Sequence, residues 1–178
     1  ILTQFNSVSL HRHISRTYHF DAFHPGWVQV LAAEQTFSSE SWYQGTADAV
    51  RKQLFEIKVT GARDILVLAG DHLYRMDYGR LMDFHRAESA DVTVAVQPVA
   101  AAEAGRFGIL KLGADGRIRS FVEKPQTPAA LQGYVSRDDP ERPYVGSMGI
   151  YVFRAEVLFD LLGGPHTDFG SDVIPSAI

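Results

Sequence analysis

The sequence has 178 residues, of which 46% are hydrophobic and 21% charged, with a formal net charge of −4 at pH 7. Such a length suits one domain or most of one, and no basic excess points to a nucleic-acid surface. No cysteine is present, which excludes disulfides and thiolate sites, and no apolar run approaches the roughly 20 residues of a membrane span.

The first part of the chain alternates strand-like and helix-like runs. The elements expected before residue 46 are a short strand, a helix, a strand and a polar, aromatic loop, over residues 1–5, 7–16, 28–32 and 37–45. An amphipathic helix is predicted over 46–59, because Ala47, Val50, Leu54 and Ile57 have helical 3-4-3 spacing. Thr46 is the expected N-cap, and Gly61 is expected to end the helix.

A strand over 64–69, a helix over 77–88 and a strand over 91–96 come next. This β-α-β-α-β order predicts an α/β fold with a mixed, mostly parallel sheet and helices on both faces. The second half then changes pattern, because strand-like runs follow one another without helices. These are 107–112, 117–124 and 144–153, with an Asp-Gly hairpin turn over 113–117, a polar surface excursion over 126–143 and a short helix over 155–162.

Asp71 stands at the end of the strand predicted over 64–69, after a single glycine. In open α/β sheets, ligands bind outside the carboxyl ends of the strands. A carboxylate there is a hard oxygen ligand that suits Mg²⁺ shared with substrate phosphates. A loop aspartate that caps a turn explains the same position, and position alone leaves both interpretations open.

Gly45 immediately precedes the helix predicted over 46–59. A glycine there lets backbone N–H groups approach a ligand closely, and a helix N-terminus favours phosphate. A plain helix cap is the alternative. The neighbouring Trp42 and Tyr43 could stack on a base or a sugar, or could be loop aromatics packed on the core.

Glu123 and Lys124 stand at a predicted strand end, before a proline. Adjacent strand residues point to opposite faces, so the two can share a site only where the strand end twists or bulges. Lys124 could then bind a phosphate and Glu123 a sugar hydroxyl; otherwise they form a solvated charge pair. Ser147 could meet a sugar, and Asp168 could cap a helix or share a helix face with Asp172.

The sequence resembles the ADP-glucose pyrophosphorylase (glucose-1-phosphate adenylyltransferase) family along nearly its whole length. The matching blocks, in the family's order, are LTQFNSVSLHRHI, QVLAAEQT, WYQGTADAVRKQL, GDHLYRMDY, FGILKL, FVEKP, SMGIYVF and DFGSDVIPSAI. GDHLYRMDY together with QGTADAV is highly specific, since other sugar nucleotidyltransferases share the strand-Gly-Asp but not HLYRMDY. The resemblance implies a Rossmann-like, GT-A-like sheet.

The resemblance implies transfer of an adenylyl group from ATP to glucose 1-phosphate, giving ADP-glucose and pyrophosphate, with Mg²⁺ as cofactor. This is the first committed step of glycogen or starch synthesis. By the same resemblance, Asp71, Lys124 and Asp168 are catalytic, and Asp71 and Asp168 bind the metal. The substrate-binding residues implied are Tyr43, Gly108, Glu123, Lys124 and Ser147, and the nucleotide-binding ones are Gln4, Trp42, Gln44, Gly45 and Thr46.

The family's N-terminal GGGxGTRL phosphate loop and its C-terminal left-handed β-helix domain are absent from residues 1–178. We therefore expect a truncated, partial catalytic domain that is inactive by itself, within a full-length parent that is a homotetramer. A cytoplasmic location is expected for a bacterial parent, and a plastid location stays open. Two alternatives are a non-catalytic regulatory subunit and a sister nucleotidyltransferase with another base or sugar.

Overall fold

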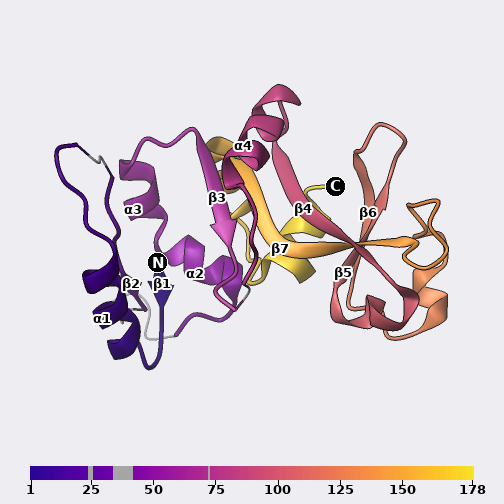
Figure 1. Cartoon of the computed structure of the whole chain (residues 1–178), viewed down its shortest axis with the longest axis horizontal. Helices are drawn as coiled ribbons and strands as arrows, with labels where there is room; N and C mark the ends of the chain where they lie inside the picture. Colours follow the sequence, from indigo (N-terminus) through magenta and orange to yellow (C-terminus); the bar gives the residue numbers. More distant parts are fainter. Residues whose placement is uncertain (24–25, 34–41, 72) are drawn as a thin grey trace.

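The computed structural model describes residues 1–23, 26–33, 42–71 and 73–178. Helices pack on both faces of a central sheet, and a smaller N-terminal part lies beside it (Figure 1). Part of the loop predicted over 37–45, and His72 of the GDHLYRMDY block, fall outside the described residues. No helix in these ranges is long and apolar enough to cross a bilayer.

The N-terminal part contains a two-stranded parallel sheet. β1 (Leu2–Thr3) pairs with β2 (Leu31–Ala32), and α1 (Val8–Thr17) separates them in the sequence. Both strands are shorter than predicted, whereas the helix agrees with the expected range to within one residue at each end.

The helix predicted over 46–59 is divided in two. α2 (Thr46–Lys52) and α3 (Leu54–Val59) meet at Gln53, whose N–H donates to the Val50 carbonyl three residues back. The Gln53 side chain also donates to the Tyr43 hydroxyl at 2.9 Å. The predicted apolar face survives the break, since Ala47 and Val50 belong to the main core and Leu54 and Ile57 pack against it. Gly61 follows α3 at φ +65°, where the helix was expected to end.

The central five-stranded sheet is antiparallel, so the prediction of a mostly parallel sheet is wrong. Among the described strands, parallel pairing is limited to β1 with β2. β3 (Asp64–Leu68) and β4 (Val92–Val99) do run in the same direction, with α4 (Tyr78–Ala87) between them. However, β7 (Tyr144–Arg154) lies between these strands and pairs antiparallel with both. The hairpin β5 (Gly108–Leu112) and β6 (Ile118–Glu123) extends the sheet, as its turn predicted.

β7 shares one of its edges between two strands. Its C-terminal half, Ile150–Arg154, pairs with β3, and its N-terminal half pairs with β5 at Val145 and Gly146. β4 pairs along the other edge of β7. Gly149 lies between the two halves at φ +68°, a conformation that glycine adopts easily. The end of β3 and the start of β5 therefore meet at the middle of β7.

The main core covers one face of the sheet. Tyr151 and Phe153 of β7 pack there against α2, α5 (Ala155–Leu161), the π-helical turn η3 (Phe169–Val173) and α6 (Ile174–Ser176). A smaller core lies under η1 (Ala101–Arg106) and η2 (Pro128–Leu131). It includes Leu131, so part of the excursion predicted over 126–143 is packed rather than solvated.

On the opposite face, α4 buries a histidine. His85 is 2% exposed, and its Nδ1 lies 2.8 Å from the Thr93 hydroxyl. Burial lowers the pKa of His85. The nearby charges of Arg154 and Arg86 lower this pKa as well, whereas the charge of Asp64 raises it. The folded protein therefore favours the neutral imidazole.

We expect the free energy of unfolding to decrease as the pH falls below about 6.5, the ordinary pKa of histidine. Below that pH the unfolded state binds a proton that the folded state resists, so protonation favours unfolding. Urea unfolding at pH 7.5 and 5.5 measures the effect. His85→Gln should reduce this dependence, whereas His11→Gln, at an exposed position, should leave it intact. An identical pH dependence in the wild type and His85→Gln would contradict the assignment.

Candidate active site

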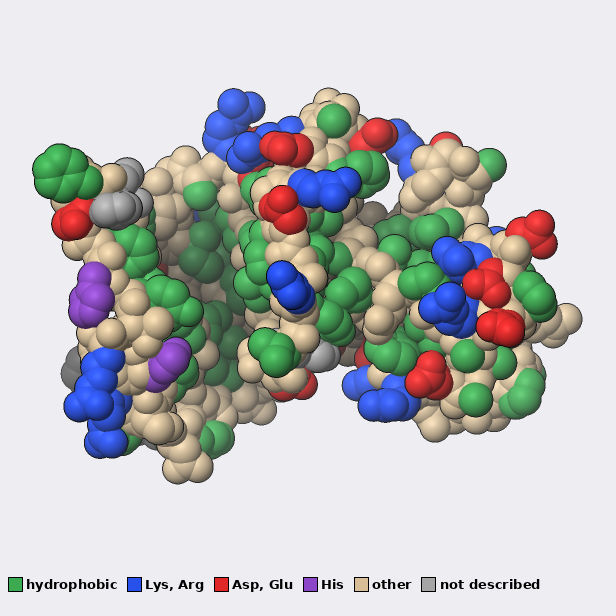
Figure 2. All heavy atoms as spheres, in the orientation of Figure 1, with side chains coloured by type: hydrophobic (Ala, Val, Ile, Leu, Met, Phe, Trp, Pro, Cys, Tyr) green, Lys and Arg blue, Asp and Glu red, His purple; other side chains and the backbone are tan. Residues whose placement is uncertain are grey.

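A cavity of about 1290 Å³ opens where β3, β5 and β6 approach the middle of β7. Figure 2 shows a recess between the N-terminal part and the central sheet, with hydrophobic side chains inside it. The predicted site residues that line the cavity are Thr46, Asp71, Gly108, Glu123, Lys124, Ser147 and Asp168. Within the described ranges, the other predicted site residues do not line it: Gln4, Trp42, Tyr43, Gln44 and Gly45.

Glu123 and Lys124 meet because the end of β6 turns sharply. Lys124 has φ +42°, in the left-handed region, and its N–H donates to the Phe107 carbonyl at 3.1 Å. This turn brings Lys124 Nζ to 3.3 Å from Glu123 Oε1. The twist that a shared site requires is therefore present. A non-glycine residue in this conformation costs roughly 1 kcal/mol, which is typical of residues at functional sites.

Two glycines leave room for the Glu123 carboxylate. A Cβ at Gly108 would lie 2.8 Å from Glu123 Oε2, and one at Gly170 would lie 3.1 Å from it. Gly108 is the register partner of Glu123 across the β5–β6 ladder. Glycine at these positions thus allows a carboxylate to pack tightly against the backbone of two separate segments.

Asp168 caps η3, which is one of the two interpretations that the sequence left open. Its Oδ1 accepts from the N–H groups of Gly170 and Ser171 at 2.8 and 3.0 Å. Its Oδ2 accepts from the Thr46 hydroxyl at 2.9 Å, and that hydroxyl accepts from the Phe169 N–H. Thr46 is therefore not the N-cap of α2, and the prediction is corrected: its hydroxyl ties the helix start to the Asp168 turn.

Asp172 does not share an exposed helix face with Asp168, because its carboxylate turns back on the loop. Asp172 Oδ2 accepts from the N–H groups of Thr167 and Asp168 at 2.8 and 3.0 Å. These backbone bonds, with one from the Ser171 hydroxyl, lower the pKa of Asp172 to about 2. Asp172 thus fixes the turn that carries Asp168.

The N-terminus of α2 is closed by the protein itself. The N–H groups of Ala47 and Asp48 donate to the Thr167 carbonyl at 2.9 and 3.1 Å. Gln44 N–H donates to Asp48 Oδ2 at 2.9 Å. Three N–H groups around the predicted phosphate-binding turn therefore already have partners. A Cβ at Gly45 would lie 2.3 Å from Thr167 O, so this backbone contact explains the glycine.

Gly45→Ala should lower the free energy of unfolding by about 2–3 kcal/mol, because the new Cβ overlaps a backbone carbonyl that cannot move aside easily. For a chain of this length we expect a melting temperature roughly 4–12 °C lower. Thermal unfolding followed by circular dichroism measures the shift. Gly70→Ala is the matched control, since a Cβ there meets nothing within 4 Å. Equal melting temperatures for the two variants would contradict the packing argument.

The remaining predicted residues form a separate cluster beside β1. Tyr43 N–H donates to Gln4 Oε1 at 2.8 Å, and the Trp42 and Phe5 ring centroids are 5.0 Å apart. Gln44 Nε2 donates to the Trp42 carbonyl at 2.9 Å. These contacts explain the residues by packing, and their roles toward a sugar or a nucleotide stay predictions.

Tyr151 lines the cavity although it was not predicted as a site residue. Burial raises the pKa of its phenol. The charges of Glu123 and Asp168 raise this pKa as well, whereas a hydrogen bond with Ser147 lowers it. The sequence pattern predicted only a strand over 144–153 and assigned no role to Tyr151. The two-residue repeat of a strand could have identified it, because residues 147, 149 and 151 then share one face of β7 and Tyr151 lies on the same face as Ser147.

The acidic residues of the cavity suit a shared Mg²⁺ ion better than a closed metal site. Within the described ranges, no three His, Cys, Asp or Glu side chains gather into a metal-binding group. Asp71 and Asp168 line the same cavity, and Mg²⁺ is commonly held by one or two carboxylates together with substrate phosphates. The two carboxylates therefore fit that arrangement.

A comparison with protein families adds an independent finding. A family model described as nucleotidyl transferase matches residues 1–178. The match includes every element that surrounds the cavity. Its description names the transferred group without naming a base or an acceptor.

Proposed function

Because the chain belongs to the nucleotidyl transferase family, we propose that its full-length parent transfers an adenylyl group from ATP to glucose 1-phosphate. The products are ADP-glucose and pyrophosphate. The observation that supports this proposal most directly is the turn at Lys124, which brings an ammonium and a carboxylate together in a cavity that also contains two aspartates. The choice of ATP and glucose rests on the GDHLYRMDY and QGTADAV blocks.

In this proposal the cavity residues bind and orient the acceptor. The Lys124 side chain, 63% exposed, can reach a phosphate in the cavity and bind it as a point charge. Glu123 accepts from a sugar hydroxyl, with the Ser147 and Tyr151 hydroxyls on the neighbouring strand face. The phosphate oxygen attacks the α-phosphorus of ATP, and pyrophosphate leaves in line. No covalent enzyme intermediate is needed, so positioning and charge neutralisation account for catalysis.

Asp71 and Asp168 would hold Mg²⁺, which neutralises phosphate charge when bound. The contacts of Asp168 favour this role, because two backbone N–H groups and a hydroxyl fix the orientation of its carboxylate beside the cavity. We further propose a cytoplasmic, homotetrameric parent, with the phosphate loop and β-helix domain flanking residues 1–178.

Substrate profiling of the parent tests the proposal. Purified protein is assayed with glucose 1-phosphate, Mg²⁺ and each of ATP, UTP, CTP and GTP, and the sugar nucleotide formed is identified by mass. ADP-glucose from ATP is the expected main product. Equal use of UTP would instead indicate a sister nucleotidyltransferase. Binding of glucose 1-phosphate without turnover would indicate a regulatory subunit.

A further inference from the structure

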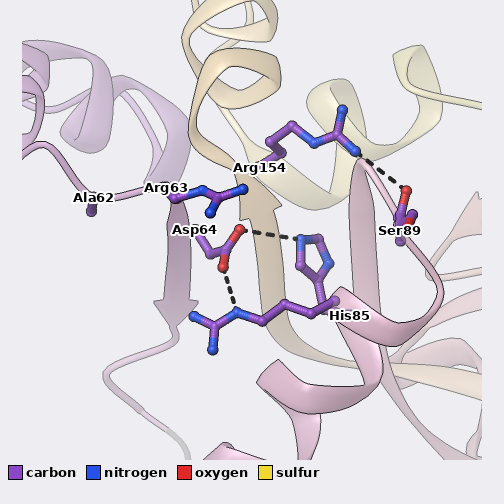
Figure 3. Close-up of a pocket in the computed structure, with 8 residues that line it drawn as sticks. Ala62, Arg63, Asp64, His85, Ser89 and Arg154 are labelled. Atoms are coloured by element: carbon purple, nitrogen blue, oxygen red, sulfur yellow. Dashed lines mark hydrogen bonds and ion pairs between the residues drawn. The ribbon is translucent and has the colours of Figure 1, made fainter.

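A second cavity, of about 760 Å³, lies at the other end of β3 from Asp71. Three arginines from different elements line it: Arg63 precedes β3, Arg86 belongs to α4 and Arg154 ends β7. Figure 3 shows Arg63 and Arg154 at the ends of neighbouring strands, near Asp64 and His85. Figure 2 shows Lys and Arg side chains over the same ends of β3 and α4. We call this cavity the arginine pocket.

Strand pairing fixes where these arginines stand. Asp64 and Arg154 are direct register partners between β3 and β7. The Ala155 N–H donates to the Arg63 carbonyl at 2.8 Å, and the Arg154 N–H donates to the Asp91 carbonyl at 2.9 Å. The backbones that carry Arg63 and Arg154 are therefore held side by side by the sheet, and the pocket is a built feature rather than a chance approach of loops.

The charges in the pocket are only partly compensated. Arg86 Nε lies 2.8 Å from Asp64 Oδ2, and Arg154 Nη1 lies 3.1 Å from Asp91 Oδ1. Across the described ranges, the Arg63 guanidinium has neither a hydrogen bond nor an ion pair. His85 also lines the pocket, with its Nε2 3.9 Å from Asp64 Oδ1, and burial lowers its pKa, which favours the neutral imidazole. One positive charge thus remains uncompensated after both pairs are counted.

Most of the guanidinium donors are also unused. Each guanidinium offers five N–H donors in a planar fork. Within the described structure, Arg86 contacts an acceptor through Nε alone, and Arg154 contacts Asp91 and the Ser89 carbonyl through Nη1 and Nη2. The pocket therefore presents many unpaired donors and a net positive charge toward a cavity.

We propose that the arginine pocket binds a small phosphorylated anion. Phosphate oxygens match the guanidinium fork and accept paired hydrogen bonds from it. The cavity volume falls in the usual range of small-molecule sites, about 300–1,000 Å³. The site is separate from the candidate active site, because a run from residue 64 to residue 71 spans roughly 20 Å when extended. The proposal does not depend on the proposed function.

Isothermal titration calorimetry of the purified protein with inorganic pyrophosphate, in Mg²⁺-free buffer, tests the proposal. Arg63→Ala should weaken the binding about tenfold or more, since it removes a charged donor that makes no hydrogen bond or ion pair within the described residues. Arg117→Ala is the matched control, because its side chain is 80% exposed on the β5–β6 turn. Lys124→Ala should keep the Arg63-dependent binding, which separates this pocket from the candidate active site.

Three results would overturn the proposal. The first is an affinity of Arg63→Ala within twofold of wild type. The second is an equal loss in Arg117→Ala, which would indicate general surface attraction. The third is equally tight binding of citrate, which would show that phosphate is not preferred. Circular dichroism of each variant confirms the fold, and Arg63→Lys, which retains charge but not the fork, should give an intermediate affinity.

Discussion

Asp71→Asn is expected to reduce turnover of the full-length parent by roughly a thousandfold or more, because it removes a carboxylate proposed to bind Mg²⁺ at the reacting phosphates. Asparagine keeps the size of the side chain, so the fold and substrate binding should change little. Asp71 stands three residues after the end of β3 and lines the same cavity as Asp168, an arrangement that fits a shared ion. Pyrophosphate release at saturating ATP and glucose 1-phosphate measures turnover.

The matched control for this experiment is Asp83→Asn, an exposed carboxylate on α4 that does not line the cavity. It should retain normal turnover. If Asp71→Asn also turned over near the wild-type rate, the metal-binding role of Asp71 would be wrong. A Mg²⁺ titration adds a second readout, since loss of a ligand should raise the Mg²⁺ concentration needed for half-maximal activity.

Lys124→Ala should lower kcat/KM for glucose 1-phosphate by roughly 10²–10³-fold, because it removes the cation proposed to bind the acceptor phosphate. The KM for ATP should change much less. Stability should not fall, since the Lys124 side chain is 63% exposed. Lys124→Gly should lose the same activity but unfold at a higher denaturant concentration than Lys124→Ala, because glycine tolerates φ +42°.

Lys58→Ala provides the control for charge removal. Lys58 lies on α3 with its Nζ 4.9 Å from the Phe159 ring centroid, and it does not line the cavity. Its kcat/KM should be unchanged. An equal loss of activity in both lysine variants would point to a general charge effect. Retention of activity in Lys124→Ala would remove the central support for the proposed function.

Local pattern predicted most elements of the fold, and long-range pairing decided the rest. Helical spacing identified the face that packs α2 and α3, and the Asp-Gly signal identified the β5–β6 turn. The direction of β3 and β4 was also implied correctly. The position of β7 between β3 and β4 was not predicted. In β3, β7 pairs with residues more than 80 positions earlier in the chain, and no local signal specifies which strands pair over such a separation.

The same distinction holds at the candidate site. Strand geometry predicted that Glu123 and Lys124 could share a site only if the strand end twists or bulges. The turn at Lys124 meets this condition. The closure of α2 by the Thr167 carbonyl could not be foreseen, since Thr167 and Gly45 are far apart in sequence. The arginine pocket was missed for the same reason, because Arg63 and Arg154 become neighbours only through strand register.

The central position of β7 also sets the order in which the sheet can form during synthesis. β3 and β4 leave the ribosome well before β7. Among the described strands, β7 is the one partner of both. At about 5–20 residues per second, β3 waits roughly 4–16 seconds for its partner. Its apolar Ile65 and Val67 are then accessible to chaperones and to other nascent chains. Substitutions that weaken β7 should therefore reduce the yield of soluble protein in cells before they alter its chemistry.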